Sequence, residues 1–240
     1  MHVRAERLTK KFGWITALDN LSWEIEPGQI VAVLGANGAG KTTLLNALSG
    51  SVLLDAGQVF FDGELVTPGR SDLRRRFAFI PDLPPVPGGW SPLRFIGTTL
   101  KLYGLSNPEV ENRVAELLDQ LDLLSVARWK FRQLSRGQAY KAVLAAFLAA
   151  DPELWFIDEP FASGMDPRGL NCFKEYSREA VERGRTIVFT TQIIEVAESF
   201  AHRICILERG QIKVCEASAT FREASAFRTF LTQPGERSEP

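Results

Sequence analysis

Short apolar runs separated by turn residues make up the first third of the chain. They predict strands over residues 3–8, 21–25, 30–34, 59–61 and 77–80. Pro27-Gly28 marks a turn before the third run, and Asp55-Ala56-Gly57 and Asp62-Gly63 are predicted as turns on either side of the fourth. The good helix formers over residues 44–48 predict a helix soon after the strand 30–34.

The middle of the chain changes to a helical pattern. Residues 82–90 hold three prolines and two glycines, so they predict a loop, which we expect to divide two lobes. Residues 91–148 are predicted to be helical. One helix face is indicated by the spacing of Leu117, Leu118, Leu121 and Leu124. Residues 143–150 are apolar nearly all round, which is typical of a buried helix.

Strand and helix patterns alternate beyond Asp151-Pro152. Strands are predicted over 154–157, 186–190 and 204–207, with an edge strand over 211–214. Helices are predicted over 167–183 and 193–200. Strands that alternate with helices indicate an α/β fold with a mostly parallel sheet. The polar residues 232–240 are predicted to form a flexible tail.

The composition is that of a globular protein and limits its partners. The 240 residues are 45% apolar and 24% charged, enough for one substantial core or two small lobes. The net charge of −1 leaves no basic excess, so nucleic acid is not predicted as a partner. No apolar run is long enough to span a bilayer, and no secretory signal is expected at the N-terminus.

The cysteines and histidines predict neither a disulfide framework nor a metal site. Cys172, Cys205 and Cys215 are odd in number and share no C-x-x-C spacing. We therefore expect buried or free thiols in a reducing cytoplasm. His2 and His202 are too few and too scattered to indicate a metal centre.

The segment from Gly35 to Thr42 carries the clearest chemical signal. Its sequence, GANGAGKT, fits the pattern G-x-x-x-x-G-K-[ST] and lies between a predicted buried strand and a predicted helix. Its glycines let successive N–H groups point at phosphate oxygens, and the new helix adds its positive N-terminal end. Lys41 would then reach the β- and γ-phosphates, and the Thr42 hydroxyl would ligate Mg²⁺. The alternative is a glycine-rich turn of an ordinary α/β protein.

Two acids end the apolar strand 154–157. Asp158 and Glu159 would face the crevice at the carboxyl end of the sheet, where ligands of α/β proteins bind. Asp158 would hold Mg²⁺ through water as a hard oxygen ligand, and Glu159 would polarise the water that attacks the γ-phosphate. The alternative, two solvated acids at a strand end, loses weight because a phosphate-binding motif precedes them in the same chain.

A third motif lies between these two. Together with them, the segment Leu134-Ser135-Arg136-Gly137-Gln138 resembles the ATPase subunit of an ATP-binding-cassette (ABC) transporter, whose signature is LSGGQ. The resemblance covers roughly residues 3–217. It implies an α/β P-loop NTPase fold with a mostly parallel sheet, an N-terminal antiparallel β subdomain and an inserted α-helical subdomain. It predicts a single ABC ATPase domain over 1–231, with a nucleotide-binding core over 1–81 and 151–218 and a helical lobe that carries the signature over 82–150.

The resemblance also assigns residues to ATP. It implies that Phe12 stacks on adenine and that the phosphates contact the P-loop residues Gly35, Asn37, Gly38, Gly40, Lys41, Thr42 and Thr43. Two subunits are expected to pack head to tail around two ATP molecules. Ser135, Gly137 and Gln138 would then face the γ-phosphate that the partner holds. Ser135 also suits the N-cap of a helix, and the two roles are compatible. The run 162–166 resembles the D-loop of the family.

Three positions depart from the family pattern. Asp82 stands where the family has a glutamine that touches Mg²⁺ and the attacking water; a carboxylate can ligate Mg²⁺ but cannot donate a hydrogen bond. Gln192 replaces the switch histidine, and its amide can still donate to the γ-phosphate. Arg136 replaces the first signature glycine, so its side chain must point away from the phosphate or contact it. Asp82 and Gln192 are thus expected beside Glu159 in the catalytic site, Asp82 also as a metal ligand, and hydrolysis is expected to be slow.

The function that this resemblance implies is an ATP-hydrolysing transport motor. ATP binding would close two cassettes, as a homodimer or a heterodimer, and hydrolysis would reopen them. This cycle of closing and reopening would drive a separate integral membrane permease, with export favoured over import. The protein would be cytoplasmic and peripheral on the cytoplasmic face of the membrane. The loop after Asp82, with Trp90 and Leu93, would form part of the docking groove for the permease or else fill the local core.

Two other functions stay open. A hydrolysis-impaired cassette that holds ATP as the clamp half of an asymmetric pair is consistent with Asp82 and Gln192. A cassette ATPase of DNA repair or translation fits less well. The interval between Lys41 and Ser135 leaves no room for the long coiled coil of the repair proteins. The translation proteins generally carry two cassettes in one chain.

Overall fold

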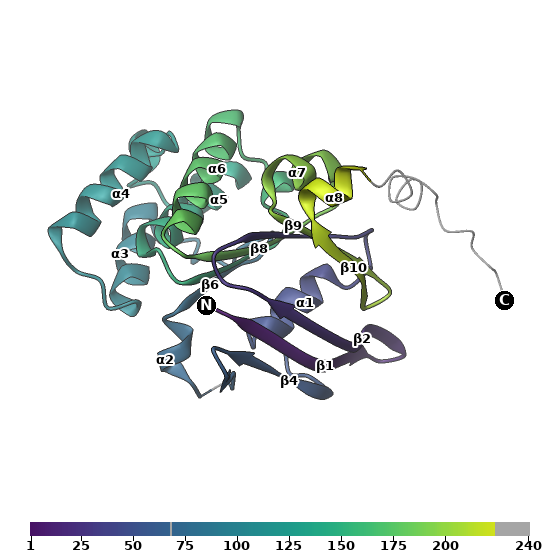
Figure 1. Ribbon diagram of the computed structural model, residues 1–240. Coiled ribbons are helices and arrows are strands. Elements are labelled where there is room, and N and C mark those ends of the chain that lie inside the picture. Colours follow the sequence, from purple (N-terminus) through teal and green to yellow (C-terminus); the bar gives the residue numbers. More distant parts are fainter. Residues whose placement is uncertain (68, 224–240) are drawn as a thin grey trace.

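The computed structural model describes residues 1–67 and 69–223, and two β-sheets organise this part of the chain (Figure 1). The first sheet has the strand order β2-β1-β4-β5, and all of its pairings are antiparallel. Its strands are β1 (Val3–Phe12), β2 (Ile15–Ile25), β4 (Ala56–Phe61) and β5 (Glu64–Leu65). This sheet is the N-terminal antiparallel subdomain that the resemblance implied.

The second sheet has six strands in the order β10-β9-β3-β8-β7-β6. Its strands are β3 (Ile30–Leu34), β6 (Phe77–Ile80), β7 (Leu154–Ile157), β8 (Thr186–Thr191), β9 (Arg203–Glu208) and β10 (Gln211–Ala217). Every pairing is parallel except the β9–β10 hairpin at one edge. The mostly parallel sheet and the edge strand after Gly210 are therefore confirmed.

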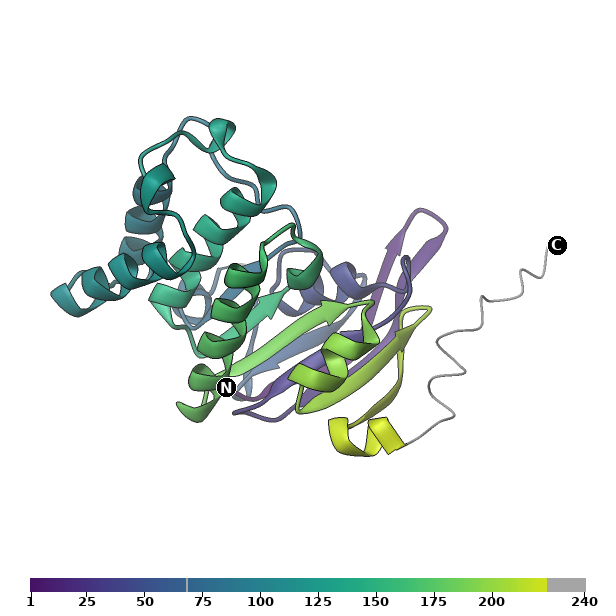
Figure 2. The same ribbon diagram turned by 90° about the horizontal axis from the view of Figure 1, so that it is seen from above.

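The helices lie on both faces of the second sheet and to one side of it (Figures 1 and 2). The α-helices are α1 (Lys41–Leu48), α2 (Ser71–Arg74), α3 (Pro92–Leu102), α4 (Pro108–Gln120), α5 (Arg136–Ala150), α6 (Pro167–Glu182), α7 (Ile194–Phe200) and α8 (Ser218–Glu223). Short 3₁₀ helices are η1 (Leu124–Val126), η2 (Phe131–Gln133) and η3 (Pro160–Ala162). Figure 2 shows the teal helices α3 and α4 extending away from the sheets.

Alternate side chains of β3 enter two separate cores. Val31 and Val33 pack with α1 and the antiparallel sheet, so α1 lies between the two sheets. Ile30, Ala32 and Leu34 face the other core, which contains the buried helix α5. A strand buried on both faces reads as a continuous apolar run, which is why the sequence identified β3.

The β1–β2 hairpin is longer than the strands predicted over 3–8 and 21–25. Its outer end includes Lys10, Lys11 and Asp19, polar residues that interrupt the apolar pattern. The turn predicted at Asp55-Ala56-Gly57 is wrong beyond Asp55, because β4 begins at Ala56. Gly57 has φ 92°, and a Cβ added there would lie 2.4 Å from the Arg7 carbonyl oxygen. This glycine marks an irregularity in strand pairing, not a turn.

The single helix predicted through Leu117, Leu118, Leu121 and Leu124 is wrong at its C-terminal end. α4 ends at Gln120, and Asp122 has a left-handed backbone with φ 54°. The chain therefore turns, and Leu124 lies 58% exposed in η1. The buried helix predicted over 143–150 is confirmed as the C-terminal half of α5.

Two of the three cysteines contradict the prediction of free thiols. A disulfide joins Cys205 of β9 to Cys215 of β10. The antiparallel register places them directly opposite each other, with their Cα atoms 3.9 Å apart. Spacing along the sequence does not reveal that register. Cys172 is free and buried, as expected.

Two further predictions concern membrane spans and the C-terminus. Among the helices within residues 1–67 and 69–223, none has the length and apolar content needed to cross a bilayer. The tail predicted over 232–240 lies outside the described residues.

Candidate functional site

The loop between β3 and α1 is shaped by close contacts at its glycines. Gly40 has φ 105°, and a Cβ added there would lie 2.4 Å from the Ala17 carbonyl oxygen of β2. A Cβ added at Gly35 would lie 2.6 Å from the Leu207 carbonyl oxygen of β9. The loop is thus packed against both sheets, and its remaining side opens on a cavity that Gly38 and Gly40 help to line.

Lys41 begins α1 and folds back over this loop. Its Nζ donates to the carbonyl oxygens of Gly35 at 2.9 Å and Ala36 at 3.4 Å. It also lies 3.2 Å from Oε1 of Glu159, and the lysine side chain is only 7% exposed. A nearly buried ammonium beside a helix N-terminus favours an anion in the cavity.

Asp158 follows β7 and is the centre of a hydroxyl network. Its Oδ2 accepts a hydrogen bond from Thr42 Oγ1 at 2.7 Å, and its Oδ1 accepts one from Thr190 Oγ1 at 2.6 Å. The residue is 2% exposed and forms no ion pair with the described part of the chain. A buried carboxylate without a protein cation, beside a threonine hydroxyl, is a set of hard oxygen donors that fits Mg²⁺.

Glu159 is held against the same network by its backbone. Its φ of 47° is left-handed, and its N–H donates to Thr190 Oγ1 at 2.9 Å. Oε1 faces Lys41, whereas Oε2 is buried and has no hydrogen-bond partner among the described residues. A buried carboxylate oxygen without a partner fits a bound water molecule.

These groups line one cavity of about 420 Å³. It brings together the predicted residues Asn37, Gly38, Gly40, Lys41, Thr42, Thr43, Asp82, Asp158 and Glu159. Ile15 and Ala17 of β2 also line it, and sequence reasoning did not find them. The volume is in the range of pockets that hold a small organic ligand.

Six predicted residues lie outside this lining as the described residues define it, three of them in the signature segment. Gly35 lies behind the loop and offers its carbonyl to Lys41. Phe12, at the end of β1, is 51% exposed, and its ring centroid lies 5.1 Å from the Lys10 ammonium. Gln192 is exposed directly after β8.

The predicted signature residues Ser135, Gly137 and Gln138 lie at the start of α5. Ser135 caps α5: its Oγ accepts from the Gln138 N–H at 3.2 Å, and Gln138 Oε1 accepts from the Ser135 N–H at 3.0 Å. The predicted N-cap is therefore confirmed. A Cβ added at Gly137 would lie 2.2 Å from the Gly164 carbonyl oxygen. These three residues are absent from the described lining of the 420 Å³ cavity.

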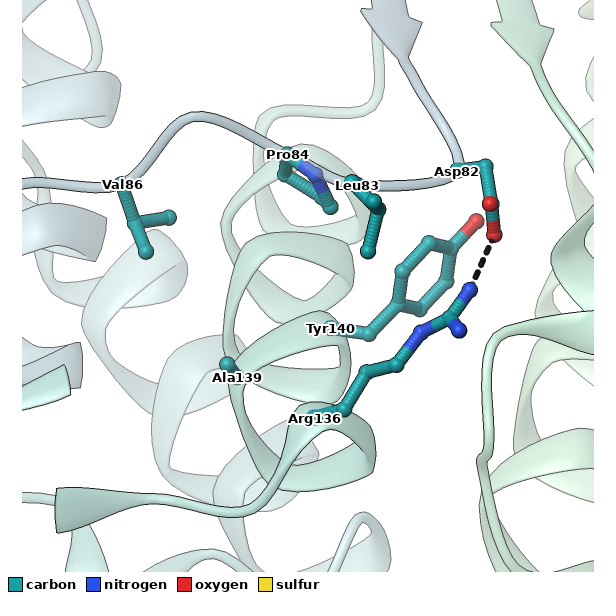
Figure 3. A pocket seen from close by; sticks show the side chains of 7 residues that line it. All are labelled: Asp82, Leu83, Pro84, Val86, Arg136, Ala139 and Tyr140. Atoms are coloured by element: carbon teal, nitrogen blue, oxygen red, sulfur yellow. Dashed lines mark hydrogen bonds and ion pairs between the residues drawn. The ribbon is translucent and has the colours of Figure 1, made fainter. Parts of the chain in front are cut away.

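Asp82 and Arg136, two of the departures from the family pattern, contact each other (Figure 3). Arg136 Nη2 lies 2.6 Å from Asp82 Oδ1. The arginine side chain therefore points from the start of α5 to the loop after β6. Asp82 lines the 420 Å³ cavity and also a second cavity of about 190 Å³, which Leu83, Pro84 and Tyr140 help to line.

Comparison with known proteins decides the family. The family model described as "ABC transporter" matches residues 18–162. The chain belongs to the ABC transporter family. Curated relatives of this ABC ATPase include the Nod factor export ATP-binding protein I of Paraburkholderia xenovorans (strain LB400), 31% identical over 93% of this chain and 73% of the relative. The daunorubicin resistance ATP-binding protein DrrA3 of Streptomyces coeruleorubidus is 35% identical over 88% of this chain and 66% of the relative.

Solved structures of ABC ATPases share the fold. The ATP binding subunit of an ABC transporter superposes with a TM-score of 0.88 at 25% identity, over 97% of this chain and 100% of that chain. An ATP-binding cassette in a dimeric post-hydrolysis state, bound to ADP and Pi, superposes with a TM-score of 0.80 at 27% identity, over 90% of this chain and 98% of that chain. The predicted fold class is confirmed, and the chain is an ATP-hydrolysing subunit of its family.

Two buried polar groups of this ABC ATPase were missed from the sequence. Thr190 bridges Asp158 and the Glu159 amide. Lys141 of α5 is 3% exposed, and its Nζ lies 2.7 Å from Oδ2 of Asp166, the N-cap of α6. The Lys141 ammonium lowers the pKa of the Asp166 carboxyl. The available signals were a threonine at the end of the strand beside β7 and a single lysine within an apolar helix.

Proposed function

We propose that the cavity in front of the P-loop is the ATPase site and that it holds ATP with Mg²⁺. The observation that carries the proposal is the convergence of Lys41, Thr42, Asp158 and Glu159 on one cavity. Thr42 and Asp158 would hold the cation, which would neutralise phosphate charge when bound. Loop amides and the N-terminus of α1 would bind the phosphates.

Each side chain of the site has its own proposed role. Lys41 would leave Oε1 of Glu159 for the β- and γ-phosphates, and Oε2 of Glu159 would hold the attacking water and accept its proton. Asp82 Oδ1 accepts a hydrogen bond from Arg136, so this carboxylate is paired with a cation of its own chain, and we assign the metal to Thr42 and Asp158. Phe12 and Gln192 are assigned to adenine and to the γ-phosphate. Because neither lines the cavity, we expect both contacts only in the loaded state.

We further propose that a complete site needs a second ABC ATPase subunit. Ser135, Gly137 and Gln138 do not line the cavity of their own chain as the described residues form it. Their contact with a γ-phosphate would therefore be made across a dimer, as a homodimer or a heterodimer. A structurally similar cassette has been solved as a dimer. Light scattering of the protein with and without ATP tests this assembly.

The proposed membrane role rests on the relatives. The two relatives described above are named for export and for drug resistance. We propose that this chain drives a separate permease from the cytoplasmic face of the membrane, in the direction of export. The division into a core over 1–81 and 151–218 and a helical lobe over 82–150 belongs to the same proposal. Co-purification with a membrane subunit encoded nearby would test it.

The direct test is calorimetry and turnover with a matched pair of variants. Asp158→Asn keeps the shape of the side chain but removes the charge, and we expect it to abolish Mg²⁺-dependent ATP affinity. Asp119→Asn, at an exposed site on α4, is the control and should behave as the parent. If the parent binds no nucleotide in the presence of Mg²⁺, the proposal is wrong.

The same assay separates a motor from a clamp. The convergence of Lys41, Thr42, Asp158 and Glu159 favours hydrolysis, because it supplies groups for the phosphates, for the cation and for the proton of the attacking water. Tight ATP binding without turnover by any assembled form would instead identify a clamp subunit.

A further inference from the structure

We infer that Arg136 is a positioning residue for Asp82. Their ion pair would allow a carboxylate to stand at the rim of a cavity that receives a polyanion. The departures from the family motif at positions 82 and 136 thus compensate each other, because the arginine offsets the negative charge of Asp82. This inference rests on the proposed nucleotide site and adds the residue that controls its charge.

Asp82 lies where its charge would affect the binding of phosphates. It follows β6 directly after Pro81 and lines the 420 Å³ cavity together with Lys41, Asp158 and Glu159. From the other side, Arg136 reaches it from the first turn of α5, with Nη2 at 2.6 Å from Oδ1 (Figure 3). One carboxylate oxygen is therefore paired with a cation, while the residue still contributes to the cavity wall.

The charge balance of the cavity explains why a cation is needed. Asp158 and Glu159 already add two acids to a site for a triphosphate, and Lys41 contacts one of them. With Mg²⁺ held by Thr42 and Asp158, a third carboxylate that neither binds the cation nor pairs with a side chain would still repel the phosphates across a short distance. Arg136 neutralises that carboxylate. The family motif reaches the same neutral state with a glutamine and a glycine.

A stabilising role does not account for the pair. The side chains of Arg136 and Asp82 are 52% and 37% exposed, and ion pairs this exposed add little to folding stability. The effect of the contact is therefore expected in nucleotide affinity.

Tyr140 offers a control at the same place. Its ring lies beside the Arg136–Asp82 contact (Figure 3), its hydroxyl is buried, and that hydroxyl has no hydrogen-bond partner in the described ranges. Burial, with the nearby charges of Asp82 and Asp158, raises the pKa of Tyr140, so the group stays neutral. It cannot replace the arginine charge, and its removal breaks no hydrogen bond found among the described residues.

The test is a double-mutant cycle on the full chain. Calorimetry would measure the affinity for the non-hydrolysable analogue AMP-PNP with Mg²⁺ in the parent, Arg136→Gln, Asp82→Asn and the double variant. We expect Arg136→Gln to weaken binding roughly fivefold to tenfold at low salt, and less at high salt. Asp82→Asn in the Arg136→Gln background should return the affinity to within about twofold of the parent. Tyr140→Phe should leave it unchanged.

Two results would overturn the inference. Arg136→Gln with the affinity of the parent would show that the arginine does not control the site. A loss that Asp82→Asn fails to restore would show that Arg136 acts on the phosphate directly. Absence of nucleotide binding by the parent would be a different failure, because it would reject the proposed function itself.

Discussion

The Nζ of Lys41 lies 3.2 Å from Oε1 of Glu159, so the P-loop lysine and the proposed general base form an ion pair. The pair is nearly buried, with side chains 7% and 15% exposed. A triphosphate would compete with the glutamate for the lysine. Nucleotide binding would therefore free the Glu159 carboxylate from Lys41, so that Glu159 could act as the base.

Glu159→Gln should separate these two events. The amide keeps the shape of the side chain but removes the negative charge that holds Lys41. We expect ATP affinity to be kept or raised, ATP-dependent dimers to accumulate, and turnover to fall by at least roughly 10²-fold. Calorimetry, light scattering and phosphate release would measure the three. Hydrolysis at the rate of the parent would show that Glu159 is not the base.

Thr190→Val should impair catalysis through the orientation of two acids. The hydroxyl donates to Asp158 Oδ1 and accepts from the Glu159 N–H, and its loss leaves both groups without that partner. We expect a lower kcat with a smaller change in KM, together with about 1–3 kcal/mol less stability. Steady-state kinetics and urea unfolding are the measurements. An unchanged kcat in a destabilised variant would reduce Thr190 to a structural role.

Gly137→Ala should destabilise the start of α5. The added Cβ would lie 2.2 Å from the Gly164 carbonyl oxygen, a distance that requires the backbone to move. Gly97→Ala within α3 is the control, because nothing lies within 4 Å of a Cβ there. Thermal unfolding should give a lower Tm for the first variant and a Tm equal to or above that of the parent for the second. Equal effects of both changes would contradict the close approach.

The stability of the protein should fall in acid through Glu153. The Arg76 guanidinium donates to this carboxylate at 2.7 Å and lowers its pKa from the usual 4.5. A depressed folded pKa contributes stability that is present above pH 4.5 and is lost as the pH falls through the folded value. Arg76 also pairs with Asp62, so the variant that isolates this carboxylate is Glu153→Gln. It should flatten the dependence of Tm on pH below 4.5, as thermal scans at several pH values would reveal. An unaltered slope would show that the pair does not contribute.

The position of motifs formed by consecutive residues was predictable from the sequence. The P-loop and the Asp158-Glu159 pair each lie at the end of an apolar strand, so the strand pattern located both. The N-cap role of Ser135 was predictable for the same reason, since a cap and its partner Gln138 are three residues apart.

Contacts that depend on tertiary placement were not predictable. Thr190 joins the site only because β8 lies beside β7. Asp82 meets Arg136 because α5 begins next to the loop after β6. Cys205 and Cys215 face each other through the register of a hairpin. Gly57 looked like a turn residue because a close approach between strands and a turn favour the same amino acid.

Ser135 is absent from the described lining of the cavity that Lys41 helps to form. In the proposed dimer, each molecule would therefore contribute the P-loop of one ATP site and the signature segment of the other. In dilute solution, the rate of ATP hydrolysis would then rise with the square of the protein concentration. It would become proportional to that concentration once nearly all molecules are in dimers. A high local concentration of the protein at the membrane would then favour dimers and so activate hydrolysis. Isolated molecules would hydrolyse little ATP, without the need for an inhibitor.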